Sequence, residues 1–70
     1  MKIPNPDVYF GKTLRVYDVD GGITEGKFAG FNYDYDDEDN LFLEFDVDDS
    51  ATGLGISFTE DEIERIEVLA

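Results

Sequence analysis

The sequence predicts a single, mainly β domain, a closed structure of short strands. Apolar residues alternate with other residues in several stretches, Gly and Asp separate these stretches, and 41% of the 70 residues are hydrophobic. The alternating residues are Leu14 and Val16, then Leu41, Leu43, Phe45 and Val47, then Leu54, Ile56 and Phe58. A period of two is typical of strands that bury one face, and Gly and Asp turns between short strands favour a closed sheet. Seventy residues make one domain with a small core, so we assign residues 1–70 to it.

The first predicted element is a short helix from Pro6 to Phe10. Asn5 can cap it, Pro6 suits its first position, and Asp7 lies at the positive end of the helix dipole. Gly11 can end it. We therefore expect one or two helical turns before the first strand.

The next predicted element is an antiparallel strand pair. Asp20-Gly21-Gly22 supplies the residues with positive φ that a tight hairpin turn requires, so the strand 13–19 should pair with the segment from Ile23 onward. In that second strand Phe28 and Phe31 lie three residues apart, which breaks the alternation. The intervening Ala29-Gly30 predicts a bulge or sharp bend, through which one long strand serves both sides of a small barrel.

The last ten residues allow two interpretations. Thr59-Glu60-Asp61-Glu62 has the form of a capping box, and a following helix would place Ile63, Ile66 and Ala70 on one face. A turn followed by a strand would instead place Ile66 and Val68 inside. We favour the strand, because a barrel needs it to close and β-branched residues suit strands.

Several short motifs, in this order, resemble those of the Sm-like (LSm) family. They are Gly11-Lys12-Thr13-Leu14-Arg15-Val16, Asp20-Gly21, Gly26, Gly30-Phe31-Asn32 and Asn40-Leu41-Phe42-Leu43. The resemblance covers residues 6–69 and implies a short N-terminal helix, residues 6–10, followed by a strongly bent five-stranded SH3-like barrel, residues 13–69. It also implies RNA binding, with Asn32 and Asn40 at the positions of two base-binding residues.

The chain departs from the family at these RNA-binding positions. Asn32 and Asn40 lie eight residues apart where the family has four, and the extra residues are acidic. A late Arg-Gly pair of the family falls on Thr59-Glu60 in this chain. We therefore keep a divergent Sm-like RNA-binding protein as an alternative function, with Asn32 and Asn40 as its candidate residues.

The charge points to a basic partner. Five basic against eighteen acidic residues give a net charge of −13, which repels nucleic acid and membrane surfaces and speeds encounter with basic proteins. The first six residues are too short and polar for a signal peptide, and no apolar run reaches the roughly 18 residues of a membrane span. We expect a cytoplasmic protein with no membrane partner.

The residue types argue against catalysis and against a dedicated metal site. The chain has no Cys and no His, so an enzyme would have to rely on a carboxylate pair, a Lys or a Tyr. Asp34, Asp36 and Glu38 have the spacing that begins a calcium loop, but Asp39 stands where that loop needs Gly and Phe45 where it needs Glu. We expect no catalytic residue, no metal and no cofactor.

The candidate partner-binding segment is Tyr33, Asp34, Tyr35, Asp36, Asp37, Glu38 and Asp39. Tyrosine rings beside carboxylates suit a Lys or Arg side chain through cation–π attraction and ion pairing. We therefore expect a non-enzymatic protein-interaction or assembly module whose acidic loop, residues 33–39, faces a basic protein segment. The plain alternative is a solvated acidic loop.

Two other uses of the chain remain open. The acidic clusters 34–39, 46–49 and 60–64 could mimic nucleic acid and inhibit a nucleic-acid-binding protein. Residues 54–58 and 63–69 could pair edge to edge in a homo-oligomer.

Overall fold

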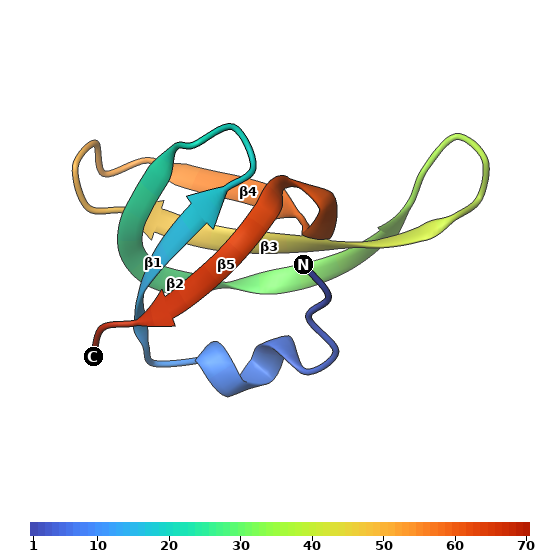
Figure 1. Ribbon diagram of the computed structural model, residues 1–70. Helices are drawn as coiled ribbons and strands as arrows, with labels where there is room; N and C mark the ends of the chain where they lie inside the picture. Colours follow the sequence, from blue (N-terminus) through green and yellow to red (C-terminus); the bar gives the residue numbers. More distant parts are fainter.

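The chain folds into one antiparallel sheet of five strands with two short 3-10 helices, as the computed structural model shows for all 70 residues (Figure 1). The elements are η1 Pro6–Tyr9, β1 Thr13–Asp18, β2 Ile23–Tyr35, β3 Leu41–Asp49, β4 Gly55–Thr59, η2 Glu60–Glu62 and β5 Ile63–Val68. The strand order is β4-β3-β2-β1-β5, which confirms the mainly β prediction. No pairing joins the outermost strands β4 and β5, so the sheet is not closed and the barrel stays a prediction.

The predicted hairpin and bulge in the first half of the chain are confirmed. β1 and β2 pair antiparallel with Tyr17 opposite Ile23, and Gly21 in the turn has a φ of 89°. The pairing of β2 with β3 shifts between Phe28 and Gly30, where Gly30 has a φ of 120°. The bulge marks a change of surroundings, because β1 pairs with β2 no further than Lys27 whereas β3 pairs with β2 as far as Tyr35.

Nine buried residues form the core. They are Ile3, Leu14, Val16, Phe28, Leu43, Phe45, Val47, Phe58 and Ile63. The alternating residues of β1, β3 and β4 thus supply most of it, as the period of two predicts. Ile3 closes the core from outside the sheet, where its backbone N–H donates to Glu60 Oε2 at 2.6 Å.

The end of the chain is a strand, as favoured. β5 pairs antiparallel with β1, and in the capping box Glu62 Oε1 accepts the backbone N–H of Thr59 at 2.9 Å, although the box opens only a single 3-10 turn. The prediction that Val68 lies inside is wrong, since Val68 is 54% exposed at the end of an edge strand, beyond the packed core. A register shift between Tyr17 and Asp18 instead lets Ile63 turn inward and become fully buried.

The N-terminal helix is shorter and tighter than predicted. It is a 3-10 helix over Pro6–Tyr9, with Pro6 at its start. The predicted side-chain cap from Asn5 is wrong, because the backbone carbonyl of Asn5 accepts the Val8 N–H at 3.3 Å and no side-chain bond forms. This i to i+3 bond is the one that defines a 3-10 turn. No helix in the chain is both long and apolar enough to cross a membrane.

Candidate functional site

The segment predicted as an acidic loop is largely a two-stranded arm, which we define as residues 32–43. It is the far end of the β2–β3 hairpin, and all of it but its base, where Leu43 is buried in the core, stands clear of the rest of the sheet (Figure 1). Tyr33 pairs with Leu43, Asp34 with Phe42 and Tyr35 with Leu41. The insertion therefore lengthens the hairpin, because its alternating tyrosines continue β2 opposite the apolar start of β3.

Only the end of the arm is a turn, and it is an ordered one, which we call the acidic turn, residues 36–40. Asp39 N–H donates to the Asp36 carbonyl and Asp36 N–H to the Asn40 carbonyl, both at 3.0 Å, while Asp39 has a φ of 59°. This is the pattern of a three-residue hairpin loop whose third residue is left-handed. The Asp36 side chain completes it, with Oδ1 accepting the backbone N–H groups of Asn40 and Glu38 at 2.9 Å.

These hydrogen bonds favour the ionised form of the Asp36 side chain. The backbone N–H of Asn40, and less strongly that of Glu38, stabilises the ionised carboxylate and lowers the pKa of Asp36 below its ordinary value. The Asp36 carboxylate thus stabilises the turn by accepting these two hydrogen bonds. Asp37, Glu38 and Asp39 are exposed, and their carboxylates accept none of these bonds.

The two faces of the arm differ in chemistry. Paired residues share a face of a strand pair and successive residues alternate between faces. Tyr33, Tyr35 and Leu41 therefore lie on one face, where they are 50%, 64% and 58% exposed, and Asp34 and Phe42 lie on the other. The structure thus separates the two rings from the Asp34 carboxylate, which the sequence placed beside them.

A row of aromatic rings anchors the apolar face of the arm to the core. The ring centroids of Phe45 and Phe28 are 4.7 Å apart, those of Phe28 and Phe31 6.5 Å, and those of Phe31 and Tyr33 5.9 Å in an edge-on contact. Such contacts stabilise the pair beyond the area they bury. Tyr33 is therefore held in place, whereas Tyr35, one step further out, has no ring partner among these contacts.

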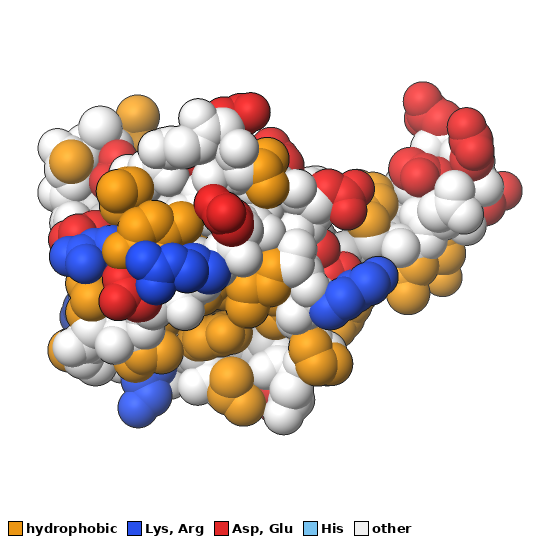
Figure 2. All heavy atoms as spheres, in the orientation of Figure 1, with side chains coloured by type: hydrophobic (Ala, Val, Ile, Leu, Met, Phe, Trp, Pro, Cys, Tyr) orange, Lys and Arg blue, Asp and Glu red, His pale blue; other side chains and the backbone are white.

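Charge is spread unevenly over the molecule. The arm carries five carboxylates and no Lys or Arg. Figure 2 shows acidic side chains gathered at the end of the arm and hydrophobic ones along its lower side. Arg15 and Arg65, the only arginines, lie on β1 and β5 in the body of the sheet. The end of the arm is therefore a concentrated negative site with an apolar face beside it.

The two candidate RNA-binding residues lie well apart. Asn32 is in β2 opposite Glu44, and Asn40 closes the acidic turn, four pairs further along the hairpin. At about 3.3 Å per residue this separates them by roughly 13 Å. Glu60, at the position of the Arg-Gly pair implied by the resemblance, holds the N-terminal segment through Ile3.

The strands named for self-assembly are the two edges of the sheet. β4 and β5 each pair with a single neighbour, β3 and β1 respectively, and Leu54, just before β4, is 66% exposed. No pocket opens on the surface, and no group of three or more carboxylates is placed to hold a metal ion.

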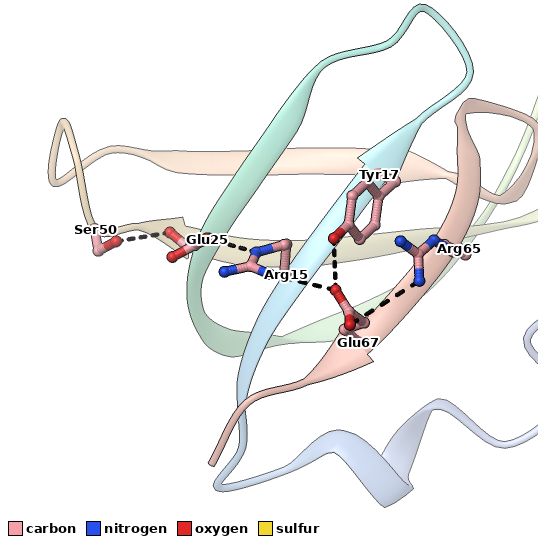
Figure 3. Close-up of polar contacts among 6 residues, drawn as sticks. All are labelled: Arg15, Tyr17, Glu25, Ser50, Arg65 and Glu67. Atoms are coloured by element: carbon pink, nitrogen blue, oxygen red, sulfur yellow. Dashed lines mark hydrogen bonds and ion pairs between the residues drawn. The ribbon is translucent and has the colours of Figure 1, made fainter.

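A polar cluster that sequence reasoning missed crosses β2, β1 and β5 on the face away from the core (Figure 3). Arg15 Nε contacts Glu25 Oε2 at 2.6 Å, and an Arg15 terminal nitrogen lies 3.4 Å from Glu67 Oε1, which also accepts the Tyr17 hydroxyl at 2.5 Å. The Arg65 guanidinium stacks 3.9 Å above the Tyr17 ring. The signal for it was the alternation of Arg15 and Tyr17 with the core residues of β1.

This polar cluster links neighbouring strands of the sheet through their side chains. Glu25 raises the pKa of Arg15, and the hydrogen bond from Tyr17 is the main cause of a lowered pKa at Glu67. Both arginines of the chain are thereby engaged with groups of their own sheet. The polar cluster joins β2, β1 and β5 and includes no residue of the arm.

The fold and the arm define a small, mainly β protein with a protruding acidic hairpin. Comparisons of the chain with protein families, with curated proteins and with solved structures found no match. We therefore base the proposed function on the geometry and charge of the arm.

Proposed function

We propose that this chain is a non-enzymatic protein-interaction or assembly module of the Sm-like small-barrel type, and that its arm binds a basic protein segment. The observation that carries the proposal is the arm itself, which stands clear of the sheet, carries five carboxylates and exposes Tyr33 and Tyr35. The strand order, the N-terminal helical turn and the bulged β2 support the small-barrel type.

The physics of the arm favours a basic protein over other partners. Five carboxylates without a compensating cation attract Lys and Arg over about one Debye length, roughly 8–10 Å in physiological salt. Each exposed ion pair contributes only about 0.2–1 kcal/mol, and a cation over Tyr33 or Tyr35 about 0.5–1 kcal/mol. We therefore expect fast, salt-sensitive binding built from several modest contacts. The same charge repels the phosphates of RNA.

A direct test compares two triple variants of equal net charge. The arm variant carries Asp37→Asn, Glu38→Gln and Asp39→Asn, which leave Asp36 to hold the turn. The body variant carries Asp20→Asn, Asp61→Asn and Glu64→Gln, three exposed carboxylates outside the arm. In affinity capture with mass spectrometry, we expect basic partners that are lost with the arm variant and retained with the body variant. Identical partners for both variants would refute the proposal.

A second candidate function is self-assembly through the sheet edges. It is supported by the position of β4 and β5 as outermost strands with exposed apolar residues nearby, Leu54 and Val68 among them. The charge of −13 per copy opposes it at low salt. Light scattering across a range of salt concentrations tests it, and a monomer at physiological salt would exclude a stable ring.

A further inference from the structure

The arm has a free backbone edge along β2. β1 pairs with β2 no further than Lys27, so beyond the bulge no strand lies on that side of residues 31–35. The residues 32–35 are all exposed. A strand edge of this kind is a template on which another extended chain can pair.

The alternation of hydrogen-bonded and non-hydrogen-bonded pairs in the arm shows which backbone groups of β2 point away from β3. Opposite residues in an antiparallel pair alternate between hydrogen-bonded and non-hydrogen-bonded pairs. Asp36 donates to Asn40 across the hairpin, so the pairs of Tyr35 with Leu41 and of Tyr33 with Leu43 are of the non-hydrogen-bonded kind. The backbone N–H and C=O groups of Tyr33 and Tyr35 therefore point away from β3.

Only one of these outward groups is already engaged within the chain. Tyr35 N–H donates to Oδ1 of the neighbouring Asp34 at 2.8 Å. No hydrogen bond outside the strand pairing involves the backbone of Tyr33. The edge thus offers a donor and an acceptor at Tyr33 and an acceptor at Tyr35.

We infer that the basic segment binds in an extended conformation and adds to this edge of β2 as a third strand of the arm. This inference rests on the proposed function, since it takes the arm as the partner-binding site. Strand addition gives affinity through the backbone and specificity through alternate side chains. The partner residues opposite Tyr33 and Tyr35 share their apolar face, and the partner residue opposite Asp34 lies on the acidic face. The segment therefore alternates apolar residues with Lys or Arg.

Charge selects this occupant over a second copy of the chain. Another copy brings a net charge of −13, and two arms edge to edge would bring their five carboxylates each into proximity. Like charges directly opposite one another on paired strands are destabilising, whereas opposite charges stabilise the pair. A basic alternating segment gains the backbone pairing and the charge pairing together.

The test uses three short synthetic peptides of alternating lysine and valine. One is unmodified, one carries N-methyl groups on the valine backbone nitrogens, and one carries the same number on lysine backbone nitrogens. The added strand is expected to run antiparallel to β2, with valines opposite Tyr33 and Tyr35. These are then hydrogen-bonded pairs, so the valine N–H groups face β2 and those of the lysines face away. All three peptides have the same charge.

We expect the unmodified and lysine-methylated peptides to bind the full chain alike in calorimetry at low salt, and the valine-methylated peptide to bind about tenfold more weakly or worse. In NMR the Tyr33 amide should become protected from exchange. Equal binding of all three peptides at the arm would overturn strand addition and leave the proposed function standing. No binding at the arm by any peptide would overturn both. Dimerisation that protects Tyr33 without peptide would assign the edge to a second copy.

A matched pair of variants tests the predicted alternation of apolar and basic residues in the bound segment. Asp34→Asn keeps an acceptor for Tyr35 N–H and removes the charge expected opposite a partner Lys, so it should weaken the unmodified peptide about threefold or more. Asp20→Asn, in the β1–β2 turn, removes the same charge elsewhere and should leave the affinity unchanged. Equal effects of the two substitutions would overturn the predicted pattern.

Discussion

The two halves of β2 share one strand and differ in what surrounds them. Before the bulge β2 lies between β1 and β3, and Phe28 is 7% exposed. After the bulge β2 pairs with β3 alone, and Tyr33 and Tyr35 are at least half exposed. The first half is paired on both edges, while the second leaves side chains and one backbone edge exposed.

The two turns at the ends of β2 are built alike. Asp18 and Asp36 each open a turn and each accept two backbone N–H groups from it through Oδ1. The left-handed position holds Gly21 in the first turn and Asp39 in the second. The acidic turn thus has the same hydrogen bonds as the β1–β2 turn, with Asp39 in place of Gly21 at the left-handed position.

The largest expected difference is between Phe28→Ala and Tyr35→Ala, on either side of the bulge. Phe28 packs against the rings of Phe45, Phe10 and Tyr9, so its truncation should lower the free energy of unfolding by about 3–5 kcal/mol. Tyr35 is 64% exposed, and its truncation should cost about 0.5 kcal/mol or less. Urea denaturation measures both, and similar losses would contradict the division of β2.

The next effect concerns the close contact of β2 with β3 in the body. A Cβ at Gly26 would overlap the backbone carbonyl of Asp48, which cannot move aside as a side chain can. Gly26→Ala should therefore lower the free energy of unfolding by about 3 kcal/mol. Gly55→Ala is the control, because its Cβ would meet Asp48 Oδ1 at an ordinary 3.7 Å. Equal urea midpoints for the two variants would refute this account of the contact.

Acid should act on the arm through Asp36. The pKa of Asp36 is lowered in the folded chain, so its contribution to the turn is complete above the ordinary value of 3.8 and is lost as pH falls through the lowered value. We expect the amide resonances of Glu38 and Asn40 to shift with a midpoint below pH 3.8 in an NMR titration. Asp36→Asn should abolish this transition; its persistence would assign it to another carboxylate.

The smallest effect concerns the left-handed position of the acidic turn, Asp39. Asp39 has a φ of 59°, a conformation that glycine adopts without steric cost. Asp39→Gly should therefore raise the free energy of unfolding by about 0.5 kcal/mol. Asp37→Gly, in the same turn at negative φ, should bring no gain. Thermal melts of both variants decide the point, and an equal gain would mean that lost charge repulsion is the cause.

The sequence predicted the features that local chemistry determines. Asp20-Gly21-Gly22 gave the turn, Ala29-Gly30 gave the bulge, and the β-branched residues of 63–68 gave a strand. The sequence predicted the pairing of β1 with β2, but it did not predict the strand pairing within the arm. An Asp-rich stretch has the composition of a loop, and only the opposing residues 41–43 make Tyr33–Tyr35 a strand.

The sequence named residues 33–39 as the candidate segment, but it did not predict how they are arranged. The charge and the tyrosines of the arm could be read directly from the chain. That Tyr33 and Asp34 face opposite ways, and that β2 has a free edge, depends on the hairpin register. The burial of Ile3 could not be predicted, because a single apolar residue outside any period carries no signal and its contact with Glu60 joins residues far apart in the sequence.

An NMR titration of the full chain with a short oligolysine at low salt tests most directly whether the arm binds basic segments. If the arm is the binding site for basic segments, the largest shifts fall on residues 33–39, and the acidic segments 46–49 and 60–64 shift far less. Adding salt should reverse the shifts, because exposed charge pairs are screened. Shifts of equal size in all three acidic segments would contradict the claim, since the arm would then be no more than part of a uniformly acidic surface.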